Sequence, residues 1–173
     1  MFIKNVILVG NGTSVLDKKL GNFIDSFDFV VRFNDFKIIG FEEYVGKRTD
    51  CWFTCGDYHL RNMKDFKRVI VHTWMYQHSP LVEKLNQSGP FEITKKEDVD
   101  RIPVACNFPS TGLIAIHQFI RECGYVTITG FDWWERKQHH YGDDLHIRGN
   151  LHKPLQEYQV IKKLESDGKL GFI

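Results

Sequence analysis

Histidines are concentrated near the end of the chain, where four of them fall within fourteen positions: His139, His140, His146 and His152. A neutral imidazole can take a proton from a hydroxyl at physiological pH, so this density favours acid–base chemistry. His152 stands two residues before Pro154, whose fixed φ suits the first position of a helix. The amides of that helix disfavour an imidazolium, which makes His152 the candidate general base. A surface cluster without a role stays the alternative.

Metal binding is the weaker interpretation of the ionisable residues. The histidine-rich segment has no cysteine, and Asp143 and Asp144 stand near the histidines at no recognised zinc-ligand spacing. Asp98 and Asp100 have the spacing that holds a divalent cation against a sugar diphosphate in many enzymes. They stand, however, in a solvated run of charges and not after an apolar strand. We therefore expect no metal site.

Two glycine-containing turns have the composition of an anion site. Gly10-Asn11-Gly12-Thr13-Ser14 follows an apolar run, and Pro109-Ser110-Thr111-Gly112 precedes an apolar stretch. Backbone N–H groups in such turns, together with the positive end of the following helix, bind phosphate. Each turn by itself could equally be a tight connection or a helix N-cap without a ligand. Because both are expected at the carboxyl edge of one sheet, their coincidence favours a ligand site.

The first turn does not complete a dinucleotide fingerprint. That fingerprint needs a third glycine at position 15, where this chain has Val15, and an acidic residue ending the second strand, whereas Asp35 comes only after Asn34. A dinucleotide-dependent enzyme is therefore the least favoured function for this chain.

Alternating strand and helix signals predict how these residues are positioned. Apolar, β-branched runs predict strands over residues 2–9, 29–33, 51–55, 68–73 and 125–129. Amphipathic or apolar stretches predict helices over 15–27, 113–123 and from 154 to about 168. Residues 89–103 give no clear pattern, and 133–151 read as a long functional loop. The alternation predicts an α/β fold: one Rossmann-like domain over residues 1–173, with a mostly parallel sheet flanked by helices.

Composition limits the function classes. With 173 residues and 42% hydrophobic content, the chain is an ordinary globular domain, and its net charge of +1 gives no general attraction for nucleic acid. Residues 6–9 form the longest apolar run near the start, too short for a signal peptide or transmembrane segment; peripheral contact with a membrane stays open. Cys51, Cys55, Cys106 and Cys123 have no zinc or redox spacing and are expected to be free thiols.

Four groups of residues occur in a fixed order. The first is Ile7-Leu8-Val9-Gly10-Asn11-Gly12, then Gly21, Ile24-Asp25, Asp28, Val31-Arg32-Phe33-Asn34, Val45-Gly46 and Thr49. The second runs from Pro109-Ser110-Thr111-Gly112 through Cys123 to Gly130-Phe131. The third is His140-Tyr141-Gly142-Asp143, and the fourth is His152 with Glu157. In this order they resemble the long, small, third and last motifs of the sialyltransferase family, glycosyltransferase family 29.

The resemblance implies a variant of the GT-A fold and an inverting transfer of sialic acid from a CMP-activated donor to a sugar hydroxyl, with no metal or other cofactor. It implies that His152 takes the proton of the acceptor hydroxyl, that His140 meets the departing phosphate, and that Glu157 orients the start of the last helix. By the same resemblance, the CMP portion would be held by Asn11, Gly12, Asn34, Ser110, Thr111, Gly112 and Gly130. The partners would be the CMP-sugar donor and a glycan acceptor.

The chain also departs from the family pattern. In the family, a cysteine of the long motif usually forms a disulfide with a cysteine of the small motif. Here the long-motif position is Val6, so Cys123 of the small motif lacks that partner. This favours a reducing, cytoplasmic location. By comparison with the family, we expect no membrane anchor and reduced acceptor-binding insertions. The acceptor therefore stays open, and so does the donor sugar, which is sialic acid or a related ulosonic acid such as Kdo. The alternative function is a nucleotide-binding module without turnover. The presence of His140 and His152 makes this alternative less favoured, because binding alone needs no general base.

Overall fold

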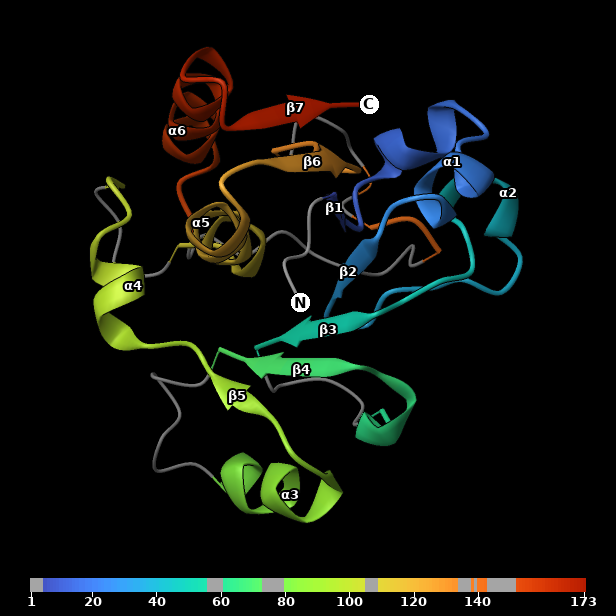
Figure 1. Ribbon diagram of the computed structural model, residues 1–173, viewed down its shortest axis with the longest axis vertical. Coiled ribbons are helices and arrows are strands. Elements are labelled where there is room, and N and C mark those ends of the chain that lie inside the picture. Colours follow the sequence, from blue (N-terminus) through green and yellow to red (C-terminus); the bar gives the residue numbers. More distant parts are fainter. Residues whose placement is uncertain are drawn as a thin grey trace.

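Seven parallel strands form one twisted sheet (Figure 1). The structure is a computed structural model that describes residues 5–55, 61–72, 80–104, 109–133, 138, 140–142 and 152–173. Along the chain the strands are β1 (Val6–Val9), β2 (Phe29–Phe33), β3 (Cys51–Thr54), β4 (Arg68–Val71), β5 (Glu92–Ile93), β6 (Val126–Thr129) and β7 (Leu170–Phe172). In space they run β5-β4-β3-β2-β1-β6-β7, and each neighbouring pair is parallel.

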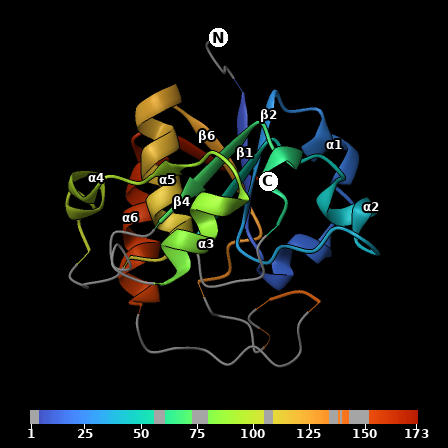
Figure 2. The same cartoon turned by 90° about the horizontal axis from the view of Figure 1, so that it is seen from below.

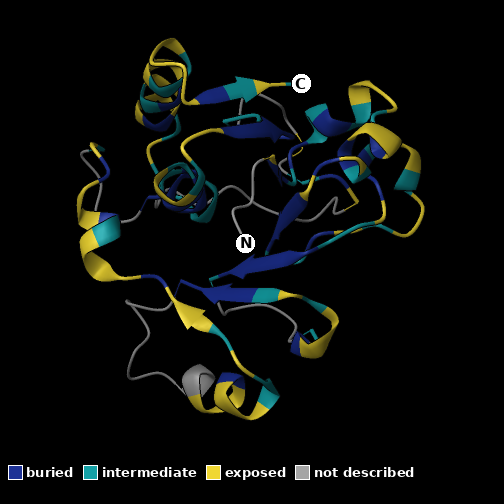
Figure 3. Ribbon diagram, viewed as in Figure 1, coloured by how far each residue is buried: buried dark blue, intermediate teal, exposed yellow. Residues whose placement is uncertain are grey.

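Helices cover both faces of the sheet (Figures 1 and 2). On one face lie α4 (Lys96–Asp100), α5 (Thr111–Cys123) and α6 (Pro154–Ser166). The other face packs against the 3-10 turn η1 (Thr13–Asp17), α1 (Gly21–Asp25) and α2 (Glu42–Val45). The remaining elements, η2 (Met63–Asp65) and α3 (Pro80–Ser88), belong to the β3–β5 half of the sheet. With helices on both faces, the central strands are fully buried, as Figure 3 shows.

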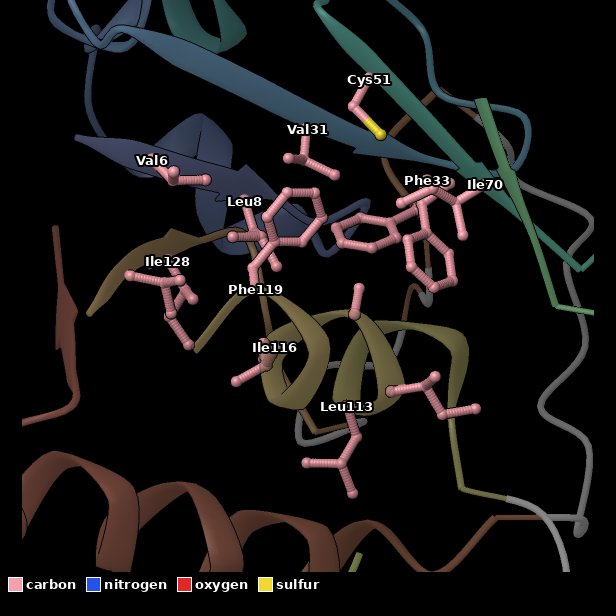
Figure 4. Close-up of a cluster of buried hydrophobic side chains, with 14 of the residues drawn as sticks. Val6, Leu8, Val31, Phe33, Cys51, Ile70, Leu113, Ile116, Phe119 and Ile128 are labelled. Carbon is pink, nitrogen blue, oxygen red and sulfur yellow. The ribbon is translucent and has the colours of Figure 1, made fainter. Parts of the chain in front are cut away.

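The helix α5 supplies the main apolar face over the sheet (Figure 4). Its Leu113, Ile116 and Phe119 pack with Leu8 and Ile70 in one buried cluster. The three-residue spacing of these α5 side chains brings them onto one side of the helix. Ser110 begins this helix as its N-cap and Gly124, in the left-handed region at φ 84°, ends it. The helix therefore covers the predicted stretch 113–123 and begins two residues earlier.

The order of the strands reverses between β1 and β6. The chain moves outward from β1 to β5, then returns to place β6 on the other side of β1. Here the backbones are in direct contact, since Gly10 N donates to Thr129 O and Gly12 N donates to Gly130 O, both over 2.8 Å. A Cβ on Gly10 would lie 2.3 Å from Gly130 O, so a side chain does not fit. Ligands of open parallel sheets bind in the crevice at such a reversal.

The predicted α/β class with a single sheet is confirmed, with three corrections. The helix predicted over 15–27 is two short pieces, η1 and α1, because the chain turns between them to bring Gly21 tightly against α2, where a Cβ would lie 2.0 Å from Glu42 O. Within the unassigned segment 89–103 lie β5 and α4, and β7 was not predicted. These elements are too short to give a periodic signal. Among the described helices, none has the length and hydropathy to span a membrane.

Candidate functional site

Two asparagines lie at the carboxyl ends of adjacent strands. Asn11 follows β1 and donates from Nδ2 to Phe33 O over 3.1 Å, while Asn34 follows β2 and accepts at Oδ1 from Cys55 N over 3.0 Å. Each carboxamide thus binds the backbone of the next strand along the sheet. Asn34 has a φ of 48°, a left-handed conformation that asparagine tolerates better than most residues. The structure therefore brings these two predicted donor-binding residues to the same edge.

The first turn differs from the prediction of a phosphate site at a helix start. Its helix is only the five-residue η1, and the start of η1 already holds a carboxylate. Asp132 Oδ2 accepts from Ser14 N over 3.2 Å and from Thr13 Oγ1 over 3.3 Å. Gly12 makes room for this group, since a Cβ there would lie 2.6 Å from the carboxyl carbon of Asp132. A side-chain anion thus takes the place that the sequence suggested for a phosphate.

The second turn keeps unbonded donors. Ser110 Oγ accepts from Leu113 N over 3.2 Å and caps α5. Among the described residues, the N–H groups of Thr111 and Gly112 have no hydrogen-bond partner. A Cβ on Gly112 would lie 2.6 Å from the ring of Phe131, so this glycine also permits close packing of helix and sheet. The positive end of α5 is therefore the better anion site.

Glu157 joins the first turns of α5 and α6. Its side chain is buried, and both oxygens are used: Oε1 accepts from Ser110 N over 2.8 Å, and Oε2 accepts from Ser110 Oγ over 2.6 Å. The carboxylate therefore holds the cap of α5, whereas the family resemblance suggested a role at the start of its own helix. Because His152 precedes α6 by two residues, this contact holds the start of the helix that follows His152 against the N-cap of α5.

His140 is held beside the first turn by its neighbour Tyr141. Tyr141 N donates to Asn11 O over 2.9 Å, and its hydroxyl donates to Lys37 O over 2.7 Å. The ring packs edge-on against Phe41 with centroids 5.1 Å apart, and burial raises the pKa of the Tyr141 hydroxyl. His140 itself is half-buried. The third group of residues thus meets the first across the strand reversal.

The sequence patterns did not point to His72, a histidine that lies near His152. It follows β4 directly and is buried. Burial, with the nearby His152 as a second cause, lowers the pKa of His72 from 6.5 to about 4. The position of His72 at the end of an apolar strand was the signal that could have identified it. His139 and His146, the other candidates, lie outside the described residues.

Comparison with known proteins decides the family. The sequence model of glycosyltransferase family 29 (sialyltransferase) matches residues 3–62 and 90–169. The chain belongs to glycosyltransferase family 29. A crystal structure of a mammalian sialyltransferase superposes with a TM-score of 0.74 at 22% identity, over 98% of this chain and 68% of that one. This agreement confirms the predicted fold.

Curated relatives of the chain are named as sialyltransferases. The CMP-N-acetylneuraminate-beta-galactosamide-alpha-2,3-sialyltransferase 4 of Rattus norvegicus is 26% identical over 93% of this chain and 61% of its own length. The type 2 lactosamine alpha-2,3-sialyltransferase of the same species is 48% identical over 46 residues, which are 27% of this chain and 14% of that protein. The chain thus spans less than two thirds of the length of these relatives.

Several residues of the long family 29 motif have structural contacts. The fully buried Arg32 donates from Nε to Arg48 O and Thr49 Oγ1, both over 3.0 Å, and from Nη2 to Val45 O over 2.6 Å. Burial lowers its pKa to about 10. Asp25 accepts from the backbone N–H of Arg48 over 2.9 Å. These contacts fix the segment after α2 against β2 and so support the edge that carries Asn34.

The acidic residues that could have bound a metal have other partners. Asp98 and Asp100 lie on α4, where Asp98 pairs with Arg121 over 2.5 Å and Asp100 with Lys96 over 2.6 Å. In the part of the chain that the structure describes, no group of three histidine, cysteine or acidic residues is placed to hold a metal ion. Cys123 is a free thiol.

Proposed function

We propose that this chain is a catalytic domain that transfers sialic acid, or a related ulosonic acid, from a CMP-activated donor to a sugar hydroxyl with inversion and without a metal. The observation that carries the proposal is the contact between Glu157 and Ser110, because it joins His152 to the helix end whose first amides have no partner among the described residues. This contact supports a site in which a proton acceptor and an anion-binding helix end lie together. The relative named for CMP-N-acetylneuraminate supports the same donor class.

The donor would lie across the reversal between β1 and β6. Asn11, Gly12 and Gly130 line the reversal, and Asn34 lies one strand further along the same edge. The N–H groups of Thr111 and Gly112 would bind the phosphate, with Ser110 fixing the turn that presents them. A single phosphate can be stabilised by helix amides, whereas a diphosphate usually needs a cation. This chemistry supports metal independence.

In the proposed reaction the acceptor hydroxyl loses its proton to His152 while its oxygen forms a bond to the anomeric carbon. The bond between that carbon and the CMP phosphate oxygen breaks, and CMP leaves with the electron pair. Attack opposite to the leaving group inverts the configuration. His140, held beside Asn11, would donate to the departing phosphate as negative charge develops there.

The test is a donor and acceptor assay in the presence of EDTA, with CMP-sialic acid and CMP-Kdo as donors and a β-galactosamide as the first acceptor. We expect His152→Ala to lower turnover on the order of 10²- to 10⁴-fold and to leave the affinity for CMP nearly unchanged. His140→Ala should lower turnover and also weaken CMP binding, because the free nucleotide already carries the phosphate charge.

Three results would contradict the proposal. A strict requirement for a divalent cation would remove the metal-independent mechanism. Wild-type turnover in His152→Ala would remove the base assignment. CMP binding without turnover with either donor would favour a nucleotide-binding module instead. We also propose a reducing, cytoplasmic location, supported by the free thiol of Cys123, and the response to reductant predicted below tests the absence of a bridge.

A further inference from the structure

We propose that Arg61 is a positioning residue for the donor: it holds the turn 34–37, and with it the side chain of Asn34, in the shape that binds CMP. Arg61 lies on the segment between β3 and β4, outside the four groups of residues that carry the family pattern. The inference rests on the proposed function, in which Asn34 binds the CMP portion.

The turn that begins at Asn34 depends on contacts from other parts of the chain. At a φ of 48°, Asn34 has a left-handed backbone that a residue other than glycine keeps only where its surroundings fix it. Side chains of three other segments donate to three backbone oxygens of this turn: Trp52 Nε1 to Asn34 O over 2.9 Å, Arg61 Nη2 to Phe36 O, and the Tyr141 hydroxyl to Lys37 O over 2.7 Å. The turn is therefore held from outside along its whole length.

Arg61 makes the largest set of these contacts. Its guanidinium carbon lies 3.9 Å from the centre of the Phe36 ring, where a cation is attracted by the face of the ring. The ring itself is buried and packs with Trp52 in the core below. Arg61 Nη2 also pairs with Asp35 over 3.3 Å, a contact that contributes little because both side chains are partly exposed. Stacking and the bond to Phe36 O thus fix the residue pair that follows Asn34.

The position of this backbone determines where the Asn34 carboxamide points. Its Oδ1 accepts from Cys55 N over 3.0 Å, so the oxygen is already used by the protein. Among the described residues, no group accepts from Asn34 Nδ2. The two N–H groups of this nitrogen can therefore donate to an oxygen of the donor. A shift of the turn would move these donors away from it.

The first test measures binding. Arg61→Met removes the charge and the planar group, and we expect the Kd for CMP and the donor KM to rise by about 10-fold, the loss for about one hydrogen bond to an anion. The value of kcat should stay within about threefold, since a contact to the nucleotide acts equally before and during the reaction. The KM of the acceptor should not change.

Arg68→Met is the matched control. Arg68 also lies over a phenylalanine, 5.5 Å from the ring centre of Phe119, and it pairs with Glu92 over 2.7 Å. It begins β4, however, and so lies at the amino edge of the sheet, opposite to Asn34. Arg68→Met should lower Tm and leave the affinity for CMP unchanged, which separates a general loss of stability from an effect on the donor site.

A double-mutant cycle tests whether Arg61 acts through Asn34. If it does, Arg61→Met should weaken CMP binding little further once Asn34→Ala is present, because coupled residues do not contribute additively. Arg61→Lys keeps the charge but not the planar fork, so it should recover only a small part of the affinity. If Arg61→Met does not fold, Arg61→Lys is compared with the wild type in its place.

A signal from the free protein tests the turn itself. The indole N–H of Trp52 donates to Asn34 O, so its ¹H–¹⁵N resonance reports the position of the turn without any ligand. Trp52→Phe identifies this resonance among the four tryptophans. Arg61→Met should shift the resonance and speed its hydrogen exchange, whereas Arg68→Met should leave both unchanged.

Three results would overturn the inference: unchanged CMP affinity in Arg61→Met, additive losses in the double variant, or full recovery by Arg61→Lys, which would mean that the charge acts on the nucleotide directly. Failure of the proposed function has a different signature. The wild type would then bind no CMP, while the Trp52 resonance would still decide whether Arg61 holds the turn.

Discussion

The contact between Glu157 and Ser110 gives a quantitative prediction. Glu157→Ala removes two hydrogen bonds to a buried carboxylate, of 2.8 and 2.6 Å. Bonds to charged groups are each worth about 1.5–3 kcal/mol, so we expect a loss of about 3 kcal/mol or more. For a chain of this size about 1 kcal/mol corresponds to about 2–4 °C, which predicts a fall in Tm of at least about 6 °C. Thermal and urea unfolding measure both quantities.

The conservative variant separates charge from geometry. In Glu157→Gln the amide oxygen still accepts from Ser110 N, and the amide nitrogen donates to Ser110 Oγ, which has a second lone pair beside its bond to Leu113 N. Two neutral bonds replace two charge-assisted ones, so about half of the stabilisation should remain. Glu165→Gln, on an exposed part of α6, serves as the control and should change stability by less than about 1 kcal/mol.

The same variants test the link to function. If Glu157 holds the end of α5 against α6, Glu157→Ala should weaken CMP binding in calorimetry as well as lower Tm, while Glu157→Gln should largely keep the affinity. A Tm of Glu157→Ala within about 2 °C of the wild type would contradict the expected loss of about 3 kcal/mol, because losing two hydrogen bonds to a buried carboxylate should lower Tm by more than that. Equal damage by alanine and glutamine would refute the assigned geometry.

Three further predictions concern stability. A reductant should leave Tm unchanged, because Cys51 and Cys123 are free thiols; a fall equivalent to about 2–5 kcal/mol would reveal a disulfide. The pKa of His72 is lowered from 6.5 to about 4, so on acidification the unfolded chain binds the proton before the folded one does. The free energy of unfolding should therefore fall by about 3 kcal/mol between pH 6.5 and pH 4. Urea unfolding of His72→Asn at the same pH values should not show this loss. Gly10→Ala should lower Tm more than Gly12→Ala. The added Cβ at position 10 would clash with the backbone oxygen of Gly130, whereas the Cβ at position 12 would meet the Asp132 side chain, which can move. Equal falls in Tm would contradict this prediction.

The sequence by itself determined the class of the fold and the two ends of the site. Apolar runs of four or five residues, each ending at glycine or a polar residue, predict buried parallel strands, and β2 lies where the pattern places it. The apolar stretch 113–123 similarly predicts α5, and the turn at Ser110, which the sequence allowed as an N-cap, begins it, because capping depends on local backbone geometry. The order of the motifs also indicated the family correctly. Strand and helix signals are local, so they can be read from neighbouring residues, and the motif order is a property of the sequence itself.

Only the tertiary structure decided which partners these residues have. Nothing near Asp132 in the sequence indicates that its carboxylate caps η1, 118 positions away from Ser14. The contact of Glu157 with Ser110 likewise depends on the strand order and on how α6 packs beside α5. Such contacts join segments that are far apart in the chain and obey no spacing rule. Folding therefore assigned the roles, while the sequence supplied the chemical groups.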